Sequence, residues 1–153
     1  MTDNAQTQTA ERQTAMKVLA HTDAALLEKK YEEFAAKPDW QFARKPETGL
    51  VMARGRIGGG GAPFNLGEIT VTRAAVTLPT GEVGHAYCHG RNQRKAAIAA
   101  FFDAALQNTA LRQKVEDQVI APCADLLAQE ATTAKEQAAA TKVDFFTLVR
   151  GDD

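Results

Sequence analysis

The sequence predicts an α+β domain, with an antiparallel sheet of three or four strands flanked by N-terminal and C-terminal helices. Alanine is concentrated toward both ends of the chain, whereas glycine, threonine and arginine are concentrated in the middle. Apolar residues recur every three or four positions at the two ends and alternate with polar residues in the middle. The expected strands are joined by connections too short for the crossover that a parallel pair needs, which favours antiparallel neighbours.

Length and composition restrict the class of protein before any motif is considered. A chain of 153 residues is long enough for one domain with its own core, so residues 1–153 are expected to form a single domain. The net charge of -1 disfavours a strongly basic nucleic-acid binder, and no apolar run is long enough to cross a membrane. The polar start, Met1 to Gln13, lacks the apolar stretch of a secretory signal. Cys88 and Cys123 are therefore expected to be reduced thiols in a cytoplasmic protein.

The N-terminal part is predicted to be helical over residues 14–37, after a disordered stretch over residues 1–13. Apolar side chains follow a period close to that of a helix, with charged residues between them. Thr22 or Asp23 could cap a second helix, so this segment is expected to be one helix or two. Pro38 is expected to end it.

Residues 40–89 are predicted to form the sheet. The expected elements, in order, are a short strand at Trp40–Arg44, a turn at 45–48, a strand at Gly49–Ile57, a loop at 58–63, one or two strands at Phe64–Leu78 with an interruption near Gly67, a turn at Pro79–Gly81 and a strand at Val83–His89. β-branched residues around Ile69 to Val76 support the central strand.

The helical period returns over residues 92–140, where Pro122 either interrupts or starts a helix. Residues 141–153 form a short apolar end that must dock somewhere. Docking onto this domain's own core and docking onto another subunit are both open. The candidate partner-binding residues of this docking tail are Phe145, Phe146, Val149 and Arg150.

Charge is divided along the chain. Residues 44–95 carry eight cationic and three anionic side chains, a balance of +5, whereas the remainder has a balance of -6. Arg54 and Arg56 are two positions apart and are expected to share one face of a strand, and arginine suits phosphate recognition. The candidate phosphate-binding residues are Arg54, Arg56, Arg73 and Arg91. A solvated sheet face or a contact with an acidic partner explains the same arginines equally well.

The run of four glycines at 58–61 is either an anion-binding nest or a flexible hairpin loop. It lacks the Lys-Ser or Lys-Thr, and the following helix, that a P-loop needs.

His85 and His89 are expected on the same face of one strand, about 13 Å apart, which is too far to share a metal ion. Cys88 would face the opposite side, so no Cys-His pair is predicted. A single histidine acting as a general acid or base and an ordinary sheet residue remain the two interpretations.

Several short segments, in this order, resemble the G subunit (PhnG) of the bacterial phosphonate carbon-phosphorus lyase system. They are Arg12-Gln13 with Met16 to His21, Glu47 to Val51, Arg54 to Gly59, Gly67-Glu68 with Thr72 to Ala74, Gly90-Arg91, and Val143 to Thr147 with Val149 to Asp152. The resemblance spans nearly the whole chain.

The resemblance implies a subunit of a complex. Its family acts with the H, I and L subunits to replace the adenine of MgATP by an alkylphosphonate, giving α-D-ribose 1-methylphosphonate 5-triphosphate, and forms a core complex with H, I and J. It implies that glycosyl transfer centres on the I subunit. The J subunit is implied to hold the iron-sulfur cluster and S-adenosylmethionine, and two separated cysteines here cannot supply the three thiolates of such a cluster. No cofactor, nucleic acid or membrane is expected on this chain, and no catalytic residue is assigned.

Three functional hypotheses follow. In the first, the domain mainly stabilises and orients the I subunit. In the second, its arginines contact a triphosphate or phosphonate in a shared active site. In the third, His85 or His89 performs acid-base chemistry in an independent enzyme.

Overall fold

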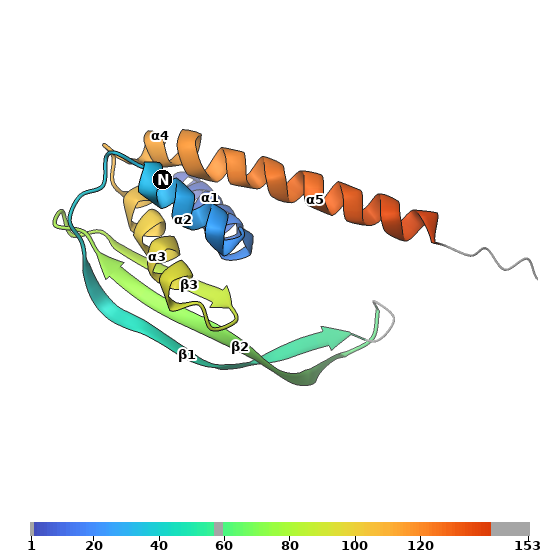
Figure 1. Cartoon of the computed structure of the whole chain (residues 1–153). Helices are drawn as coiled ribbons and strands as arrows, with labels where there is room; N and C mark the ends of the chain where they lie inside the picture. Colours follow the sequence, from blue (N-terminus) through green and yellow to red (C-terminus); the bar gives the residue numbers. More distant parts are fainter. Residues whose placement is uncertain (1, 57–59, 142–153) are drawn as a thin grey trace, which may run out of the picture.

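The computed structural model describes residues 2–56 and 60–141. Its elements are α1 (Thr2–His21), α2 (Ala24–Glu33), β1 (Gln41–Arg56), β2 (Pro63–Thr77), β3 (Val83–His89), α3 (Gln93–Gln107), α4 (Arg112–Val115), a π-helical segment (Glu116–Ile120) and α5 (Ala121–Ala140). The strands form an antiparallel sheet in the order β1-β2-β3. Figure 1 shows the helices on one face of this sheet. The predicted α+β class is therefore confirmed.

The N-terminal segment is a helix, so the disorder predicted for residues 1–13 is wrong for the part that the structure describes. Arg12 and Glu11 of α1 form ion pairs with Asp103 and Arg112, which lie far along the chain. These contacts fix the polar first part of α1, which has few apolar side chains to bury, against α3 and α4. The local pattern could not reveal them, because both partners come from the C-terminal half.

A second helix begins close to the predicted cap. The carboxylate of Asp23 accepts hydrogen bonds from the backbone N–H groups of Ala25 (2.9 Å) and Leu26 (3.2 Å). These bonds satisfy two of the amides that a helix start leaves without partners. α2 ends at Glu33, before the expected stop at Pro38.

β1 is one continuous strand, and the turn predicted at residues 45–48 is wrong. Arg44 lies opposite Ala75 and Glu47 lies opposite Arg73, so β1 is paired with β2 on both sides of Lys45 and Pro46. The turn-forming residues produce shifts in register between Phe42 and Glu47 instead. Pro46 is tolerated because β1 lies at an edge of the sheet, where a missing N–H need not cost a ladder hydrogen bond.

β2 is also continuous, and the interruption predicted near Gly67 is a bulge. Gly67 lies opposite Ala53, and the next pair is Asn65 with Arg54. Leu66 is therefore an extra residue on β2, which allows the two strands to bend together.

The turn predicted at Pro79–Gly81 is found between β2 and β3. The N–H of Gly81 donates to the carbonyl of Leu78 (2.9 Å), and Gly81 has φ of 101°, a conformation that favours glycine. β3 has the predicted bounds.

α3 forms the centre of the core. Every residue from Ala96 to Leu106 is buried. The helix lies so close to β3 that a methyl group added at Gly84 would overlap the carbonyl oxygen of Ala100 and the backbone nitrogen of Ala104. Small residues on both elements are therefore required for this contact.

Aromatic contacts join α2 to α3. The rings of Tyr31 and Phe101 meet edge to face with centroids 5.2 Å apart, and those of Phe34 and Phe102 meet in the same way at 5.7 Å. Trp40 donates its indole N–H to the Tyr31 hydroxyl (2.9 Å), which ties the start of β1 to the same cluster.

The C-terminal helices form one continuous stretch from α4 to α5. Pro122 lies at the start of α5, just after the π-helical segment. Proline has no backbone N–H to donate, and the wider turn of the π-helical segment accommodates it. Residues 128–140 are all exposed, and Figure 1 shows α5 extending beyond the other helices. The predicted docking tail beyond residue 141 lies outside the described residues. No helix in the described part of the chain is long and apolar enough to span a bilayer.

We predict that Gly84→Ala lowers the free energy of unfolding by about 3 kcal/mol or more, because the added methyl group would force α3 away from β3. Denaturant unfolding of the isolated protein measures this. Gly49→Ala is the matched control, since a Cβ there meets no atom within 4 Å, and its effect should stay within about 0.5 kcal/mol. Equal stability of the two variants would contradict the close helix-strand contact.

Candidate functional site

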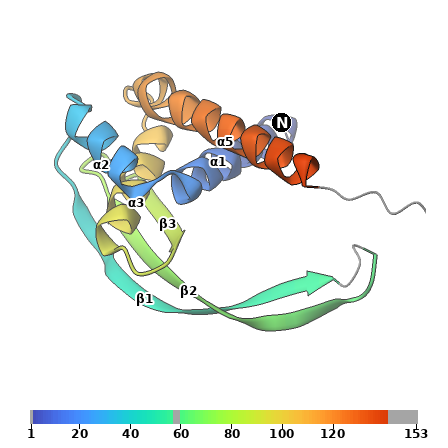
Figure 2. The ribbon, with the colours of Figure 1, turned by 45° about the vertical axis from the view of Figure 1, so that its right-hand side comes forward.

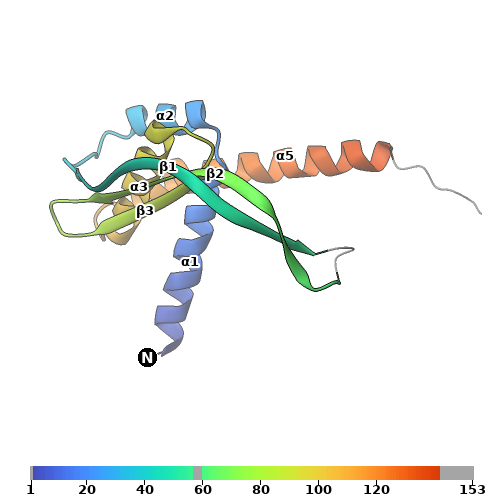
Figure 3. The same ribbon diagram turned by 90° about the horizontal axis from the view of Figure 1, so that it is seen from below.

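Arg54 and Arg56 lie on a two-stranded extension of the sheet. β3 pairs with β2 only as far as Val71, so residues 50–56 of β1 and 63–70 of β2 continue without a third strand. We call these residues the arm; Figure 3 shows the arm running clear of the helices. Both arginines are exposed, and neither has a carboxylate partner among the described residues. The neighbouring glycine run lies partly outside the described residues.

Arg73 lies on the sheet face opposite the helices and is already paired. Its Nε lies 3.2 Å from Oε1 of Glu47, which also accepts from Arg44 (2.9 Å). The hydrogen bond from Arg44, with the charge of Arg73, holds the pKa of Glu47 below its usual value. Glu47 therefore remains ionised at neutral pH and partly neutralises Arg73.

The four candidate phosphate-binding arginines do not converge. Arg54 is seven residues along β1 from Glu47, the cross-strand neighbour of Arg73, a distance of about 23 Å at the usual rise of a strand. An odd separation also places Arg54 and Glu47 on opposite faces. Arg91 is exposed in the loop between β3 and α3. Only Arg54 and Arg56 are brought together by the fold.

β3 alternates as the sequence predicts. Gly84, Ala86 and Cys88 are buried beneath the helices, and His85, Tyr87 and His89 are exposed on the open face. Burial raises the pKa of the Cys88 thiol, although the nearby Lys95 opposes this effect, so Cys88 is a weak nucleophile at neutral pH.

The two exposed histidines of β3 are separate from carboxylates. Within the described residues neither His85 nor His89 has a carboxylate partner, and their cross-strand neighbours Ala75 and Val71 are apolar. In the described ranges no three His, Cys, Asp or Glu side chains lie close enough to hold a metal ion.

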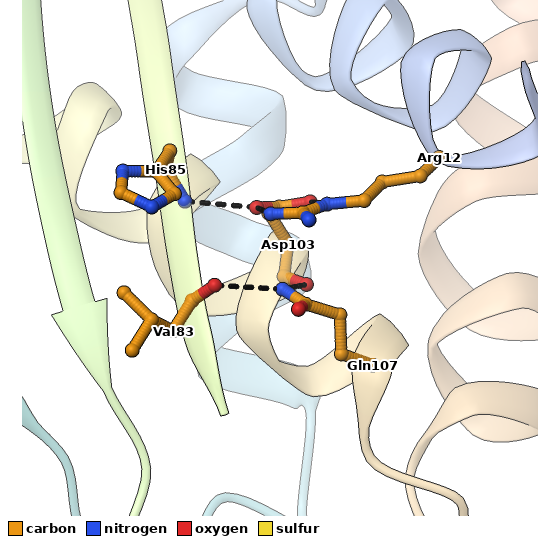
Figure 4. Close-up of polar contacts among 5 residues, drawn as sticks. All are labelled: Arg12, Val83, His85, Asp103 and Gln107. Atoms are coloured by element: carbon orange, nitrogen blue, oxygen red, sulfur yellow. Dashed lines mark hydrogen bonds and ion pairs between the residues drawn. The ribbon is translucent and has the colours of Figure 1, made fainter. Parts of the chain in front are cut away.

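Asp103 is the only buried charged residue of the described chain, and it joins three elements. Its carboxylate accepts from Nε (2.9 Å) and Nη2 (2.7 Å) of Arg12 on α1, and from the backbone N–H of His85 on β3 (2.8 Å). Figure 4 shows the guanidinium and the carboxylate facing each other. This paired geometry supplies the charge compensation that a carboxylate inside a core requires.

Gln107 extends this network along the free edge of β3. Its side-chain N–H group donates to the carbonyl oxygen of Val83 (2.8 Å) and to that of Asp103 (3.0 Å) (Figure 4). Asp103 and Gln107 thus occupy main-chain groups of β3 that would otherwise be available to another strand.

A groove of about 680 Å³ lies beside this network, between α1, α3 and α4. Three of its four charged side chains are paired, since Arg112 contacts Glu11 (2.8 Å) and Arg12 contacts Asp103, whereas Glu116 has no ion pair among the described residues. No histidine or cysteine lines it. The described lining of the groove therefore offers a carboxylate but no imidazole or thiol.

The arm exposes six of the nine large apolar side chains that are exposed in the described chain. They are Leu50, Val51, Met52, Phe64, Leu66 and Ile69, with Leu50 and Leu66 exposed by 61% and 64%. Leu50 and Val51 are consecutive in β1, so they point to opposite faces. Both faces of the arm therefore expose apolar side chains, and the face of Leu50 and Met52 also carries Glu68 and Arg54.

Comparison with known proteins identifies the family. The sequence model of the family described as phosphonate metabolism protein PhnG matches residues 10–151. The chain belongs to this family. A relative from Rhizobium meliloti (strain 1021), described as alpha-D-ribose 1-methylphosphonate 5-triphosphate synthase subunit PhnG, is 49% identical over 144 residues, which cover 94% of this chain and 92% of the relative. The resemblance to PhnG inferred from short segments is confirmed.

Two features of this PhnG family member escaped sequence reasoning. Asp103 is the only charged residue between Ala96 and Leu106, and a lone carboxylate in an apolar helix was a usable signal for a buried ion pair. The arm also had a signal, because Leu50, Val51 and Met52 are consecutive apolar residues in a strand, which places apolar side chains on both faces.

We predict that Asp103→Asn lowers the free energy of unfolding by about 2 kcal/mol, less than for a fully buried pair because 37% of the Arg12 side chain is exposed. Arg12→Met should cost more, since it leaves the fully buried carboxylate without its cation. Thermal and denaturant unfolding measure both.

Glu28→Gln is the control, because it removes an exposed ion pair with Arg94 (2.9 Å) and should change stability by about 0.5 kcal/mol or less. If Asp103→Asn is no worse than this control, the network does not hold α1 in place.

Proposed function

We propose that this chain is a non-catalytic subunit of the complex that transfers the ribose triphosphate moiety of ATP to methylphosphonate and releases adenine, in organic phosphonate catabolism. Membership of the PhnG family and the name of the Rhizobium relative support the assignment of this reaction to the complex. The chain's contribution is to hold and orient companion subunits in the cytoplasm. The I subunit is the first of these, with H and J in the core complex and L acting with it.

The observation that carries this proposal is the uncovered arm. A two-stranded ribbon is only marginally stable alone in water, and contiguous exposed apolar surface marks a protein contact. The arm has six large apolar side chains on its two faces and no covering helix in the described structure. A companion subunit that enclosed the arm would remove this surface from water.

α5 supports the same role. Its residues beyond Leu127 are exposed on every side, so this part of the helix is not needed to cover the domain's own core. Figures 1 and 2 show α5 and the arm leaving the domain on the same side. Two extensions of this kind are suited to holding a neighbour in a defined orientation.

The reaction chemistry is assigned to companion subunits under this proposal. Cys88 and Cys123 are both buried and belong to β3 and α5, so neither is presented as a cluster ligand. The iron-sulfur cluster and S-adenosylmethionine then belong to the J subunit, MgATP is a substrate of the complex, and this chain binds no cofactor of its own.

A second candidate function is phosphate binding by Arg54 and Arg56. Two exposed guanidinium groups share one face of the arm without a carboxylate partner in the described residues. They could contact the triphosphate or the phosphonate in an active site shared with a companion subunit.

We predict that the double substitution Leu50→Ser with Leu66→Ser weakens co-purification with the I subunit by about tenfold or more, because it removes two apolar contacts from the enclosed arm. The isolated protein should keep its unfolding temperature, since both side chains are mostly exposed. Tyr87→Ala, which removes an exposed aromatic side chain (54%) from the sheet outside the arm, is the matched control. Normal co-purification of the double variant would refute the role of the arm.

We predict that Arg54→Ala with Arg56→Ala leaves the complex assembled but raises the ATP concentration needed for adenine release by about tenfold, if these arginines bind phosphate. Adenine release at varied MgATP measures this. Arg94→Ala removes an exposed arginine of α3 that pairs with Glu28, and serves as the control. Unchanged dependence on ATP in an assembled complex would exclude the second candidate function.

A further inference from the structure

The hydrogen bonds of β2 define which main-chain groups of the arm face outward. The carbonyl of Thr70 accepts from the N–H of Gly90, which follows β3, so Thr70 directs its main-chain groups toward the β3 side. Successive residues of a strand direct these groups to opposite sides. Ile69 and Val71 therefore direct theirs toward β1.

The same alternation identifies the open groups of β1. Ile69 and Val71 lie opposite Val51 and Gly49, so these two residues of β1 face β2. Leu50 and Met52 consequently direct their N–H and C=O groups away from the sheet. In the ranges that the structure describes, no hydrogen bond to another residue occupies this edge.

The two ends of the β1 edge differ in their protection against pairing with another strand. Near the domain, the edge carries the sequence Arg44-Lys45-Pro46-Glu47, and charges and proline are the usual means of blocking strand addition. The stretch Gly49–Ala53 contains neither. The opposite edge of the sheet is partly occupied by Asp103 and Gln107. The unprotected stretch is therefore local and coincides with the apolar arm.

We propose that a companion subunit adds a β-strand to the free edge of β1 at Gly49–Ala53, pairing with the main-chain groups of Leu50 and Met52. This inference rests on the proposed function and specifies how the arm is held. Strand addition supplies main-chain hydrogen bonds and aligns side chains on both faces of the sheet. The added segment is extended, uncharged and apolar, because the residues of β1 beside it, Gly49–Ala53, include no charged side chain and present Leu50 and Met52 on one face and Val51 on the other.

A second copy of this chain fits the edge less well than a different subunit does. Pairing two arms edge to edge would satisfy the main-chain groups but leave Leu50 and Met52 on one face, and Val51 and Ile69 on the other, exposed in both copies. The result would be a wider ribbon with a larger apolar surface in water, which is unfavourable. A subunit whose strand belongs to its own domain can also cover the faces.

The test compares Met52→Pro with Met52→Ala in complexes co-expressed with the H, I and J subunits. Proline removes the outward N–H and is tolerated on an edge strand, whereas alanine shortens the side chain and keeps the N–H. Met52→Pro should weaken assembly about tenfold more than Met52→Ala. Unfolding temperatures of the isolated variants check that the arm still folds.

Amide hydrogen exchange of the unsubstituted protein gives a second measurement that does not depend on the folding of a variant. In the assembled complex, the amides of Leu50 and Met52 should exchange at least about tenfold more slowly than in the isolated chain. The amides of Gly49 and Val51 should change less, because β2 already protects them.

Equal assembly of the two variants, with no slowing at Leu50 and Met52, would overturn the strand addition. If Leu50→Ser with Leu66→Ser still disrupted that complex, the arm would remain an interface and only its mode of contact would be wrong. If the isolated chain were a dimer that Met52→Pro dissociated, the occupant would be a second copy and the proposal would also be overturned.

Discussion

The ion pair between Arg12 and Asp103 is the constraint on which the rest of the fold depends. A carboxylate in the middle of an otherwise apolar buried helix needs a cation, and α1 supplies it with two hydrogen bonds. The remaining capacity of the carboxylate binds the N–H of His85, so the same group fixes β3 beside α3. One buried charge thereby fixes the position of α1, whose Ala15, Val18 and Leu19 also pack in the core, and occupies part of a sheet edge.

This arrangement leaves the sheet asymmetric. The helices cover one face, the Asp103 network covers part of the β3 edge, and the edge of β1 is left open where it extends into the arm. The base of β1 carries charges and Pro46, but the stretch from Gly49 to Ala53 carries no such protection. The arm, which the fold does not cover internally, is extended and exposes apolar side chains, in agreement with the proposed contact with a companion subunit.

The cationic residues of the middle segment are distributed over separate surfaces. The balance of +5 over residues 44–95 does not produce one anion site, because Arg73 is paired with Glu47 on the open face whereas Arg54 and Arg56 lie on the arm. Neither exposed histidine of β3 has a carboxylate partner among the described residues. Among the described residues, the four candidate arginines therefore do not form a single site.

The sequence by itself determined the α+β class, a helix cap at Thr22 or Asp23, the alternation of β3 and the family, because these depend on periodicity and short motifs. Only the tertiary structure decided that α1 is ordered, that β1 is one strand and that the four arginines are separated. Each of these depends on contacts between residues far apart in the chain, such as Arg12 with Asp103 and Glu47 with Arg73. The secondary-structure propensity of a segment does not depend on such distant partners. Their hydrogen bonds and charge compensation are stronger than this propensity.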